Sequence, residues 1–397
     1  MKNDKIDILI IGAGASGAAA AWNLSQSGYK IICLEQGPNI KKESYSFDQQ
    51  NWELYQQSKF NINPNIRKLK SDYPIDDKNS AISIANFNAV GGSTILYSGH
   101  FPRFHPSDFK TKKLDNVGYD WPIDYNDLEY YYELNDKKMG VAGHEGDPAY
   151  PYIPNLLPPI PLGYMGERIA KGFNKLNWHW WPSYSGIATK NIKGRKKNSR
   201  STVDITYWPE AISNGVELKP NCHVQKITTS MSGKANGVIY IDANNKKQIQ
   251  SASLIIVACN GIGTPRLLLN SANKMFPKGL ANSSGLVGKN LMLHPLGYVE
   301  GQFSKFLGSF VGPQGCCIAS QEFYETRKNA EFKRGYTIQV LRGTGPLETA
   351  LQIKKFNKLS FGKNFHKQFL KNYGHTIPVA IICEDLPEKS NFIKLDH

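Results

Sequence analysis

The segment IDILIIGAGASGAAAAWNLSQSGYKIICLEQG, residues 6–37, decides the fold of this protein. It opens with an apolar run, Ile6–Ile11, that has the length of a buried parallel strand. Gly12, Gly14 and Gly17 follow with the spacing G-x-G-x-x-G at the start of a helical stretch. A second apolar run then ends in Glu35. This order predicts a β-α-β unit of the dinucleotide-binding kind.

Each glycine of this motif has a physical role of its own. Gly12 allows a tight turn, Gly14 lets the backbone approach a pyrophosphate, and Gly17 lets the helix pack closely on the sheet. The helix, expected over residues 15–27, directs its N-terminal N–H groups and the positive end of its dipole at that phosphate. Glu35 lies where a carboxylate can accept a hydrogen bond from a ribose hydroxyl. We therefore expect a dinucleotide site with an adenosine end.

Other interpretations of the N-terminus are weaker. Three glycines can arise by chance, but here strand, glycines, helix, second strand and acid all occur in register. Lys2 and Lys5 before an apolar run resemble a secretory signal, which Asp4, Asp7 and the glycine register oppose. No apolar stretch is long enough to span a bilayer. We expect an unprocessed, cytoplasmic protein that reaches a membrane or leaves the cell only through a partner.

Length and composition indicate a globular protein. The 397 residues can form more than one core, so two domains are expected. A hydrophobic content of 40% and an aromatic content of 11% exclude a disordered chain. The net charge of +15 would attract anionic surfaces, and the densest basic run is KGRKKNSR at 193–200. This run has no interleaved aromatics, so we expect a solvated loop and no nucleic-acid partner.

The six cysteines give no sign of a metal site or a disulfide framework. They include no C-x-x-C pair, and no cysteine and histidine cluster has zinc spacing. Cys33 and Cys259 lie inside apolar, strand-like runs, where a free thiol behaves as a small hydrophobic group. The adjacent Cys316 and Cys317 are also expected to be buried. We predict no metal ion and a reducing compartment.

Further elements follow along the chain. Residues 81–88 are strand-like and lead into a second glycine turn, GGST at 91–94. Asp124 is a candidate N-cap for a helix that runs toward Met139. A pattern that resembles β-α-β returns later, with strands expected at 216–218, 222–227, 237–242 and 253–258, a glycine turn at 260–265 and a helix from about Arg266. Beyond Pro295, strand-like stretches at 297–303, 336–341 and 376–383 predict an antiparallel sheet.

With these segments in view, the chain resembles the glucose-methanol-choline (GMC) oxidoreductases, FAD enzymes that oxidise alcohols and sugars. The resemblance rests on five stretches in the family's order: GAGASG at 12–17 with Glu35, GGST at 91–94, DWPIDYNDLE at 120–129, GIGTPRLLL at 261–269 and GLVGKNLMLHP at 285–295. A sixth, CEDLPEKSNFIKLD at 383–396, resembles the strand pair that precedes the family's last segment. Within the family, the chain most resembles the bacterial sugar and sugar-acid (gluconate) dehydrogenase branch.

The resemblance implies an α/β fold with two domains. A Rossmann-like FAD-binding domain, discontinuous in sequence, is expected to comprise residues 1–40, 81–110 and 200–295. A second, α+β substrate domain built on an antiparallel sheet is expected to comprise residues 41–80, 111–199 and 296–397, incomplete at its C-terminus.

The resemblance also implies which residues hold the cofactor. The glycines of the first motif would hold the pyrophosphate, Glu35 the adenosine ribose, and Val224 the adenine through its backbone. The GGST turn would pass beside the flavin, with Tyr97–Gly99 close to the isoalloxazine ring. The expected FAD-binding residues are Gly12, Gly14, Ala15, Ser16, Gly17, Glu35, Gln36, Gly91, Gly92, Ser93, Thr94, Tyr97, Ser98, Gly99, Val224 and Ala258.

Two departures from the family's pattern bear on the cofactors. Some members bind FAD covalently through a histidine at the position of Leu96, and leucine cannot form that bond. Some sugar dehydrogenases of this branch carry a cysteine cluster in the segment that corresponds to 185–200, where this chain has no cysteine. We therefore expect non-covalent FAD and no iron–sulfur cluster.

The implied reaction is hydride transfer from a hydroxyl-bearing carbon of an alcohol, sugar or sugar acid to flavin N5, with a histidine as general base. In the family this histidine pairs with a second His or Asn in a C-terminal segment. Here that pair would lie beyond His397, so the catalytic residues stay unknown and we expect a C-terminally truncated form.

Two alternatives stay open. One is a non-catalytic flavin-binding subunit or fragment that needs a partner chain for activity. The other is an NAD-dependent Rossmann enzyme, which the first motif alone suggests and the GGST and GIGTPRLLL turns oppose. Separately, an electron-transfer subunit is a possible partner. The electron acceptor, the exact alcohol or sugar and the oligomeric state are not determined by the sequence.

Overall fold

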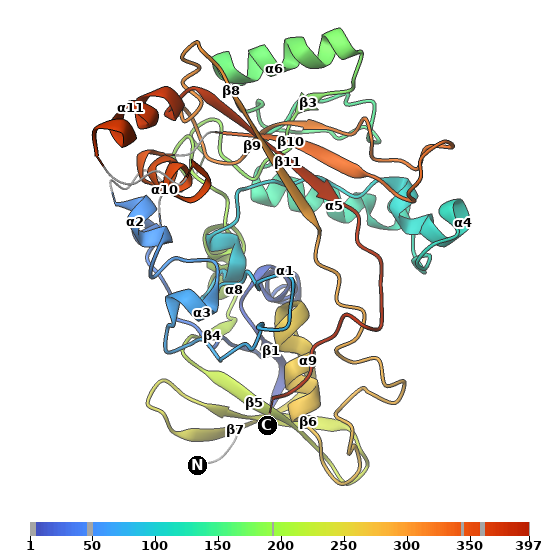
Figure 1. The fold of residues 1–397 in the computed structure, drawn as a ribbon. Coiled ribbons are helices and arrows are strands. Elements are labelled where there is room, and N and C mark those ends of the chain that lie inside the picture. Colours follow the sequence, from blue (N-terminus) through green and yellow to red (C-terminus); the bar gives the residue numbers. More distant parts are fainter. Residues whose placement is uncertain (1–4, 46–50, 193, 343–344, 358–361, 397) are drawn as a thin grey trace.

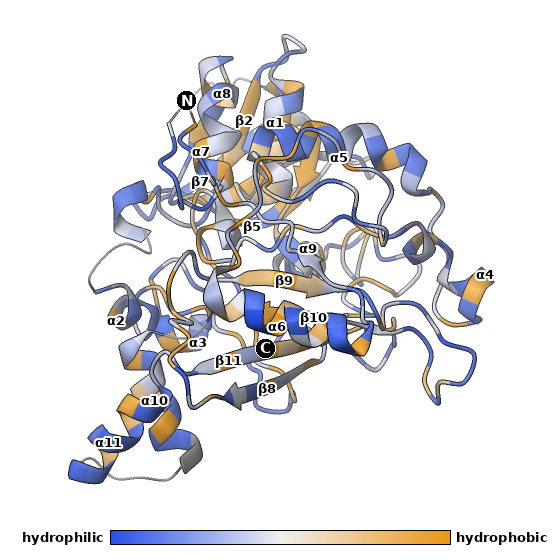
Figure 2. Ribbon diagram, turned by 90° about the horizontal axis from the view of Figure 1, so that it is seen from above, coloured by the Kyte–Doolittle hydropathy of each residue, from blue (hydrophilic) through white to orange (hydrophobic). Residues whose placement is uncertain are grey.

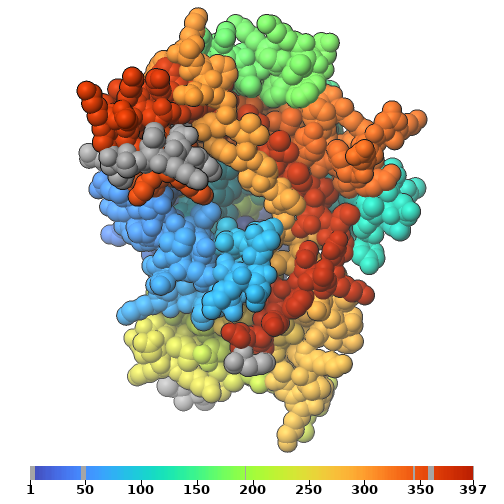
Figure 3. Space-filling model, viewed as in Figure 1, coloured from blue at the N-terminus to red at the C-terminus, as the bar shows by residue number. Residues whose placement is uncertain are grey.

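The computed structural model describes residues 5–45, 51–192, 194–342, 345–357 and 362–396. Two β-sheets organise it, a six-stranded sheet in the lower half of Figure 1 and a five-stranded sheet in the upper half. Residues 52–90 fill the space between the two halves on the face shown in Figure 3, where they are blue to cyan. Lys2, Asp4, Lys193 and His397, on which expectations were stated, lie outside the described residues.

The six-stranded sheet has the order β4-β2-β1-β7-β6-β5. Its parallel half contains β1 (Ile6–Ile11), β2 (Ile31–Leu34), β4 (Glu217–Lys219) and β7 (Lys247–Val257). All four residues of β2 are buried, as expected for a parallel strand covered on both faces. The predicted Rossmann-like unit is therefore confirmed.

The other half of this sheet differs from the prediction. The strands β5 (His223–Thr229), β6 (Ala235–Ile241) and β7 form an antiparallel meander, and the structure, which describes all of residues 223–257, has no helix between them. The expectation of a repeated β-α-β pattern is thus wrong for this region. The connections are short turns, and a turn of a few residues can join only antiparallel neighbours.

Two helices begin where parallel strands end. Helix α1 (Ala15–Leu24) follows β1, and α9 (Asn260–Asn270) follows β7. Helix α1 is three residues shorter than the expected 15–27 stretch, and α9 begins at Asn260 instead of near Arg266. The side chain of Asn260 explains this, because its Oδ1 accepts the N–H groups of Ile262 and Gly263 and closes the first turn.

The core of the lower half lies on both faces of β1. Ile8 and Ile10 pack into one cluster with Ala18, Ala21 and Trp208, which belongs to α8 (Trp208–Ser213). Leu9 and Ile11, whose side chains point to the opposite face, pack into a second cluster with residues of β5 and α9. The short α7 (Val203–Thr206) lies beside α8. This two-sided burial holds the end of β1 in place.

The five-stranded sheet is antiparallel throughout and confirms the second predicted sheet. Its order is β3 (Trp181–Pro182), β9 (Cys316–Ser320), β10 (Tyr336–Leu341), β11 (Thr376–Cys383) and β8 (Leu296–Gln302). Helix α6 (Gly163–Leu176) covers one face with Met165, Ala170 and Phe173. Figure 2 shows α6, which has hydrophilic and hydrophobic sides, lying across this sheet beside the hydrophobic β9.

The remaining helices are short, apart from α5 (Tyr125–Met139) and the pair α10 and α11. Asp124 caps α5, since its carboxylate accepts the N–H groups of Asn126 and Asp127, as predicted. The pair is α10 (Pro346–Asn357) and α11 (Lys363–Asn372). The short helices are η1 (Lys42–Tyr45), α2 (Trp52–Gln56), α3 (Pro64–Arg67), η2 (Gly92–Ile95), η3 (Pro106–Lys110) and α4 (Thr111–Asp115).

Three local expectations are wrong. Residues 81–88, all of them described, form no strand, because the N–H of Asn86 bonds to a loop carbonyl and that of Phe87 to the Ser93 hydroxyl. The described residues 384–396 form no strand pair but cross from the upper to the lower half (Figure 1), held by a bridge between Lys289 and Phe392. In the basic run, Arg200 is buried instead of solvated.

Candidate functional site

A cavity of ≈ 220 Å³ lies at the carboxyl ends of β1, β2 and β7. It brings together eleven of the residues expected to bind a cofactor: Gly12, Gly14, Ala15, Ser16, Glu35, Gln36, Gly92, Ser93, Thr94, Val224 and Ala258. Gly17, Gly91, Tyr97, Ser98 and Gly99 do not line it. Residues that were not expected also contribute to the wall, including Tyr73, Phe87, Asn88, Cys222, His223, Cys259, Asn260, Gly263, Arg266 and Leu267.

The first glycine turn is packed as its sequence motif requires. Gly12 has φ +100°, and a Cβ there would lie 2.5 Å from the carbonyl oxygen of Ala258. A Cβ on Gly17 would lie 1.9 Å from the carbonyl oxygen of Gly12, so α1 can approach β1 only with glycine at that position. Gly14 differs, since its Cβ would meet only Gly92, at 3.8 Å, and so leaves open space at the start of α1.

That start of α1 is suited to an anion. Its N-cap, Gly14, provides no side-chain hydrogen bond, and no acidic side chain lies in its first turn, whose residues are all described. The N–H groups and the positive end of the helix dipole therefore face the cavity, and no side chain of the first turn competes for them. A phosphate group fits this position.

The second glycine turn closes on the first. The N–H of Gly91 donates to the carbonyl oxygen of Ala13 at 3.0 Å, and a Cβ on Gly92 would lie 2.8 Å from the Cα of Gly14. Both glycines have positive φ. Thr94 fixes the turn by donating to the carbonyl oxygen of Gly91 at 2.6 Å. The two turns thus form one wall of backbone around the cavity.

Glu35 is held rigidly at the end of β2. It is only 5% exposed, and its carboxylate accepts N–H bonds from Ala13 and Gly37, each at 2.8 Å. Burial raises the pKa of Glu35 to about 7, although the two N–H donors oppose this rise. Each carboxylate oxygen keeps a second lone pair, which can accept a ligand hydroxyl.

The segment Tyr97–Gly99 leads from the cavity to the upper sheet. The Tyr97 hydroxyl donates to the carbonyl oxygen of Ser201, and the carbonyl oxygen of Gly99 accepts the N–H of Gly186. His100 follows, with Nδ1 at 3.1 Å from the Ser183 hydroxyl. Burial lowers the pKa of His100 to about 4, so its imidazole is neutral at physiological pH.

Several residues of the cavity wall were not predicted from the sequence, although two of them lie in segments that the motifs had marked. His223 and Arg266 each stand in a segment that was singled out, next to Val224 and within GIGTPRLLL respectively. Tyr73 comes from the polar stretch 41–80, where no pattern marked it. The centre of its ring lies 4.3 Å from the Arg266 guanidinium carbon.

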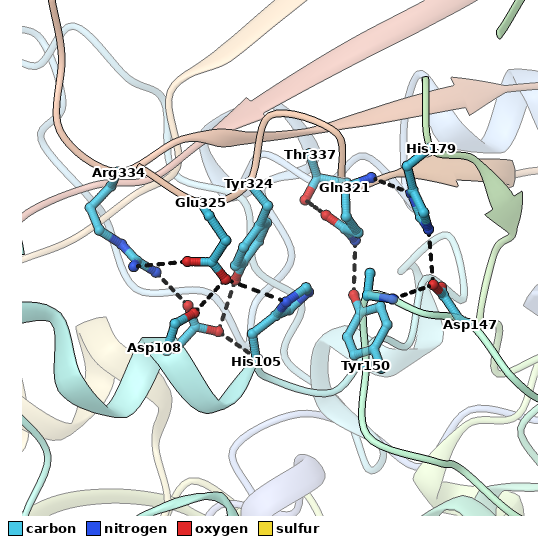
Figure 4. A network of polar contacts seen from close by, with 12 residues as sticks. His105, Asp108, Asp147, Tyr150, His179, Gln321, Tyr324, Glu325, Arg334 and Thr337 are labelled. Atoms are coloured by element: carbon cyan, nitrogen blue, oxygen red, sulfur yellow. Dashed lines mark hydrogen bonds and ion pairs between the residues drawn. The ribbon is translucent and has the colours of Figure 1, made fainter. Parts of the chain in front are cut away.

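A second polar network lies away from the cavity and connects η3 with the loop between β9 and β10 (Figure 4). The buried Arg334 forms ion pairs with Asp108 at 2.5 Å and Asp115 at 3.2 Å. The Tyr324 hydroxyl donates to Asp108 at 2.8 Å, and its ring stacks on His105. These contacts link the segment after residue 104 to the upper sheet.

Within the described ranges, no three or more His, Cys, Asp or Glu side chains form a group that could hold a metal ion. The helices of those ranges are all too short or too polar to cross a membrane.

Together, the fold and the cavity define a dinucleotide-binding α/β protein with a second, antiparallel sheet. The sequence model of the family described as GMC oxidoreductase matches residues 6–296. The chain therefore belongs to the GMC oxidoreductase family, as its sequence motifs predict. FAD is the cofactor that membership of this family implies.

Two known relatives are similar over almost the whole chain. The 2-methyl-1,2-propanediol dehydrogenase of Mycolicibacterium austroafricanum is 38% identical over 99% of this chain and 74% of its own length. The fructose dehydrogenase large subunit of Gluconobacter japonicus is 27% identical over 100% of this chain and 77% of its own. Among solved structures, a formate oxidase of Aspergillus oryzae RIB40 shares the fold, with a TM-score of 0.63, 13% identity and coverage of 96% and 73%.

Proposed function

We propose that this protein is an FAD-dependent oxidoreductase that acts on CH–OH groups of alcohols, sugars or sugar acids. The observation that carries this proposal is the cavity in which the two glycine turns, the start of α1 and Glu35 meet. The relatives named for 2-methyl-1,2-propanediol and fructose support small molecules with several hydroxyl groups as the substrate class.

Within this proposal, different groups of the expected residues bind different parts of FAD. Gly12, Gly14 and the first turn of α1 hold the pyrophosphate, because Gly14 leaves space there and the helix start has no capping side chain. Glu35 accepts a ribose hydroxyl through a free lone pair, and Gln36 lies beside it. The remaining assignments are Ala15, Ser16 and Gly17 at the pyrophosphate, Gly91, Gly92, Ser93 and Thr94 beside the flavin, Tyr97, Ser98 and Gly99 near the isoalloxazine ring, Val224 at the adenine and Ala258 at the adenosine end.

Bound FAD would accept the hydride that leaves the hydroxyl-bearing carbon, which amino-acid side chains cannot do. The chain's own contribution is to bind and orient the cofactor with fixed backbone groups. We assign no base for the hydroxyl proton among the described residues.

The proposal includes non-covalent attachment of FAD. Leu96, at the position of the covalent histidine of other members, packs against the apolar cluster around Tyr45, Trp52 and Phe87. A leucine side chain has no nucleophilic atom, so it cannot form a covalent bond to FAD, and here it is packed against this cluster.

The proposed domain division has residues 1–40, 81–110 and 200–295 in the FAD-binding domain. Residues 41–80, 111–199 and 296–397 then form the substrate domain. The two sheets support this division, with β1, β2, β4, β5, β6 and β7 in the first part and β3 and β8 to β11 in the second. Tyr73 belongs to the second part by sequence but lines the cavity of the first.

A second candidate function is a flavin-binding subunit that becomes active with a partner polypeptide. Strand β8 favours it, since all seven of its residues are exposed and, within the described ranges, it pairs only with β11 at the edge of the sheet. Leu296 and Val299 on this strand are 62% and 59% exposed. An exposed edge strand with apolar side chains is a template for pairing with another chain.

An anaerobic absorption spectrum tests both candidates. The purified chain is loaded with FAD and then mixed in turn with 2-methyl-1,2-propanediol, fructose and gluconate. Bleaching of bound flavin supports the complete oxidoreductase. The subunit is supported if bound flavin stays oxidised with each substrate and bleaches only after a second polypeptide is added. That polypeptide corresponds to the part of the relatives' sequences that this chain does not cover. Failure to bind FAD refutes both.

A further inference from the structure

The adenosine end of the cavity contains two polar side chains whose role the proposed function leaves open. Glu35 and Val224 mark this end, and the N–H of Cys222 connects them by donating to the carbonyl oxygen of Glu35 at 2.7 Å. His223 and Arg266 line the same cavity. Neither belongs to the residues proposed to hold FAD.

Arg266 is a cation with unused donors. It lies on α9, is half-buried, and forms no hydrogen bond or ion pair with any residue of the described ranges. Its guanidinium carbon lies 4.3 Å from the centre of the Tyr73 ring, a cation–π geometry. The planar guanidinium has five N–H donors, and stacking on a ring leaves them free to point outward in its plane.

His223 complements this group. Its Nε2 is buried and has no hydrogen-bond partner in the described part of the chain. Burial and the positive charge of Arg266 lower the pKa of His223, so the imidazole is neutral. A buried polar atom without a partner is unfavourable, and a ligand that supplies the partner therefore gains affinity.

Tyr73 is held in position by the segment before it. Asp72, the residue before Tyr73, is fixed by a buried ion pair with Arg67 at 2.7 Å. Asn88 donates to the same carboxylate at 2.7 Å and itself lines the cavity. A Cβ on Gly263 would lie 3.3 Å from the Tyr73 hydroxyl, so the ring rests on the first turns of α9. Tyr73 thus connects the stretch 41–80 to α9 across the cavity wall.

We propose that Arg266, held by Tyr73, and His223 bind the adenine ring and thereby determine how tightly the adenosine half of the cofactor is retained. Adenine presents ring nitrogens that accept hydrogen bonds and an amino group that donates, which suits a guanidinium and a neutral imidazole. This inference rests on the proposed function, because it takes FAD as the ligand.

The test measures the dissociation constants of FAD and of ADP, which shares the adenosine and the two phosphates of FAD but lacks its flavin half. Arg266→Leu is expected to weaken both ligands by about tenfold to hundredfold, the range for a hydrogen bond to a charged group. Tyr73→Leu is expected to weaken both by about two- to fivefold, and Tyr73→Phe to leave both unchanged, because the ring is kept. His223→Phe should also weaken both.

A matched control is Arg327→Leu. The Arg327 guanidinium carbon also lies 4.3 Å from the centre of an aromatic ring, that of Phe323, but in the upper half of the molecule. This change should leave both constants unchanged, and the melting temperature of each apo variant shows whether the chain still folds.

Three results would overturn the inference: unchanged constants in Arg266→Leu, a loss for FAD without a loss for ADP, or equal effects of Tyr73→Leu and Tyr73→Phe. If the unaltered chain binds neither FAD nor ADP, the proposed function itself fails. If the unaltered chain binds both and the variants bind them equally well, only the role of these residues fails.

Discussion

Replacing His105 with phenylalanine should make the protein less sensitive to acid. The His105 ring is sandwiched between Tyr324 and Tyr150, with ring centroids 4.0 Å and 4.2 Å away (Figure 4), and its Nε2 is buried without a partner in the described residues. Burial lowers the pKa of His105 to about 4, from 6.5 in the unfolded chain. Phenylalanine keeps the stacked ring and removes the titrating group.

The magnitude follows from the two pKa values. Between them the unfolded chain binds a proton that the folded chain does not, so the free energy of unfolding falls as the pH falls from 6.5 toward about 4. Integrating this linkage from about pH 7.5 to about pH 5 gives a loss of about 2 kcal/mol from His105 alone. The Glu325 carboxylate, 3.8 Å from Nδ1 of His105, is exposed to solvent, so its attraction for the imidazole contributes little.

Urea unfolding at the two pH values measures the effect. We expect the stability difference between them to be about 2 kcal/mol smaller in His105→Phe than in the unaltered protein. The exposed His366 provides the control, and His366→Phe should leave the difference unchanged. If His105→Phe also leaves it unchanged, the imidazole is not held neutral by its burial between the two tyrosines.

Three further outcomes are expected. Gly17→Ala should yield protein without flavin, because the added Cβ would lie 1.9 Å from a backbone oxygen. Gly261→Ala should keep its flavin, because no atom of the described residues lies within 4 Å of the added Cβ. Equal flavin contents in the two variants would contradict this. Asp136→Asn should lower the free energy of unfolding in urea by about 3–5 kcal/mol, since it leaves the buried Arg103 without its carboxylate, and a change under about 1 kcal/mol would refute that. Acid precipitation should release the flavin into the supernatant, and flavin in the pellet would show that Leu96 does not prevent covalent attachment.

The elements that the sequence predicted well are those whose cause is local. β1, α1 and β2 follow from an apolar run, three glycines and a terminal acid, and α5 begins at the Asp124 cap. The strands over 336–341 and 376–383 match their predicted bounds. The strands expected at 81–88 and in 384–396, both described in full, did not form, because backbone N–H groups such as those of Asn86, Phe87 and Ile393 bond to loop carbonyls or a side-chain hydroxyl instead of a neighbouring strand.

The sequence by itself determined the dinucleotide unit, the two sheets and the family, because glycine spacing and hydrophobic periodicity act within one or two elements. Only the tertiary structure decided which residues close the cavity around Glu35 and Val224. Tyr73 and Arg266 are far apart in the chain, and a contact between them depends on how the stretch 41–80 folds back over α9. It also decided the ionisation of Glu35, His100 and His105, because the shift of each pKa is set mainly by burial, and burial exists only once the chain has folded.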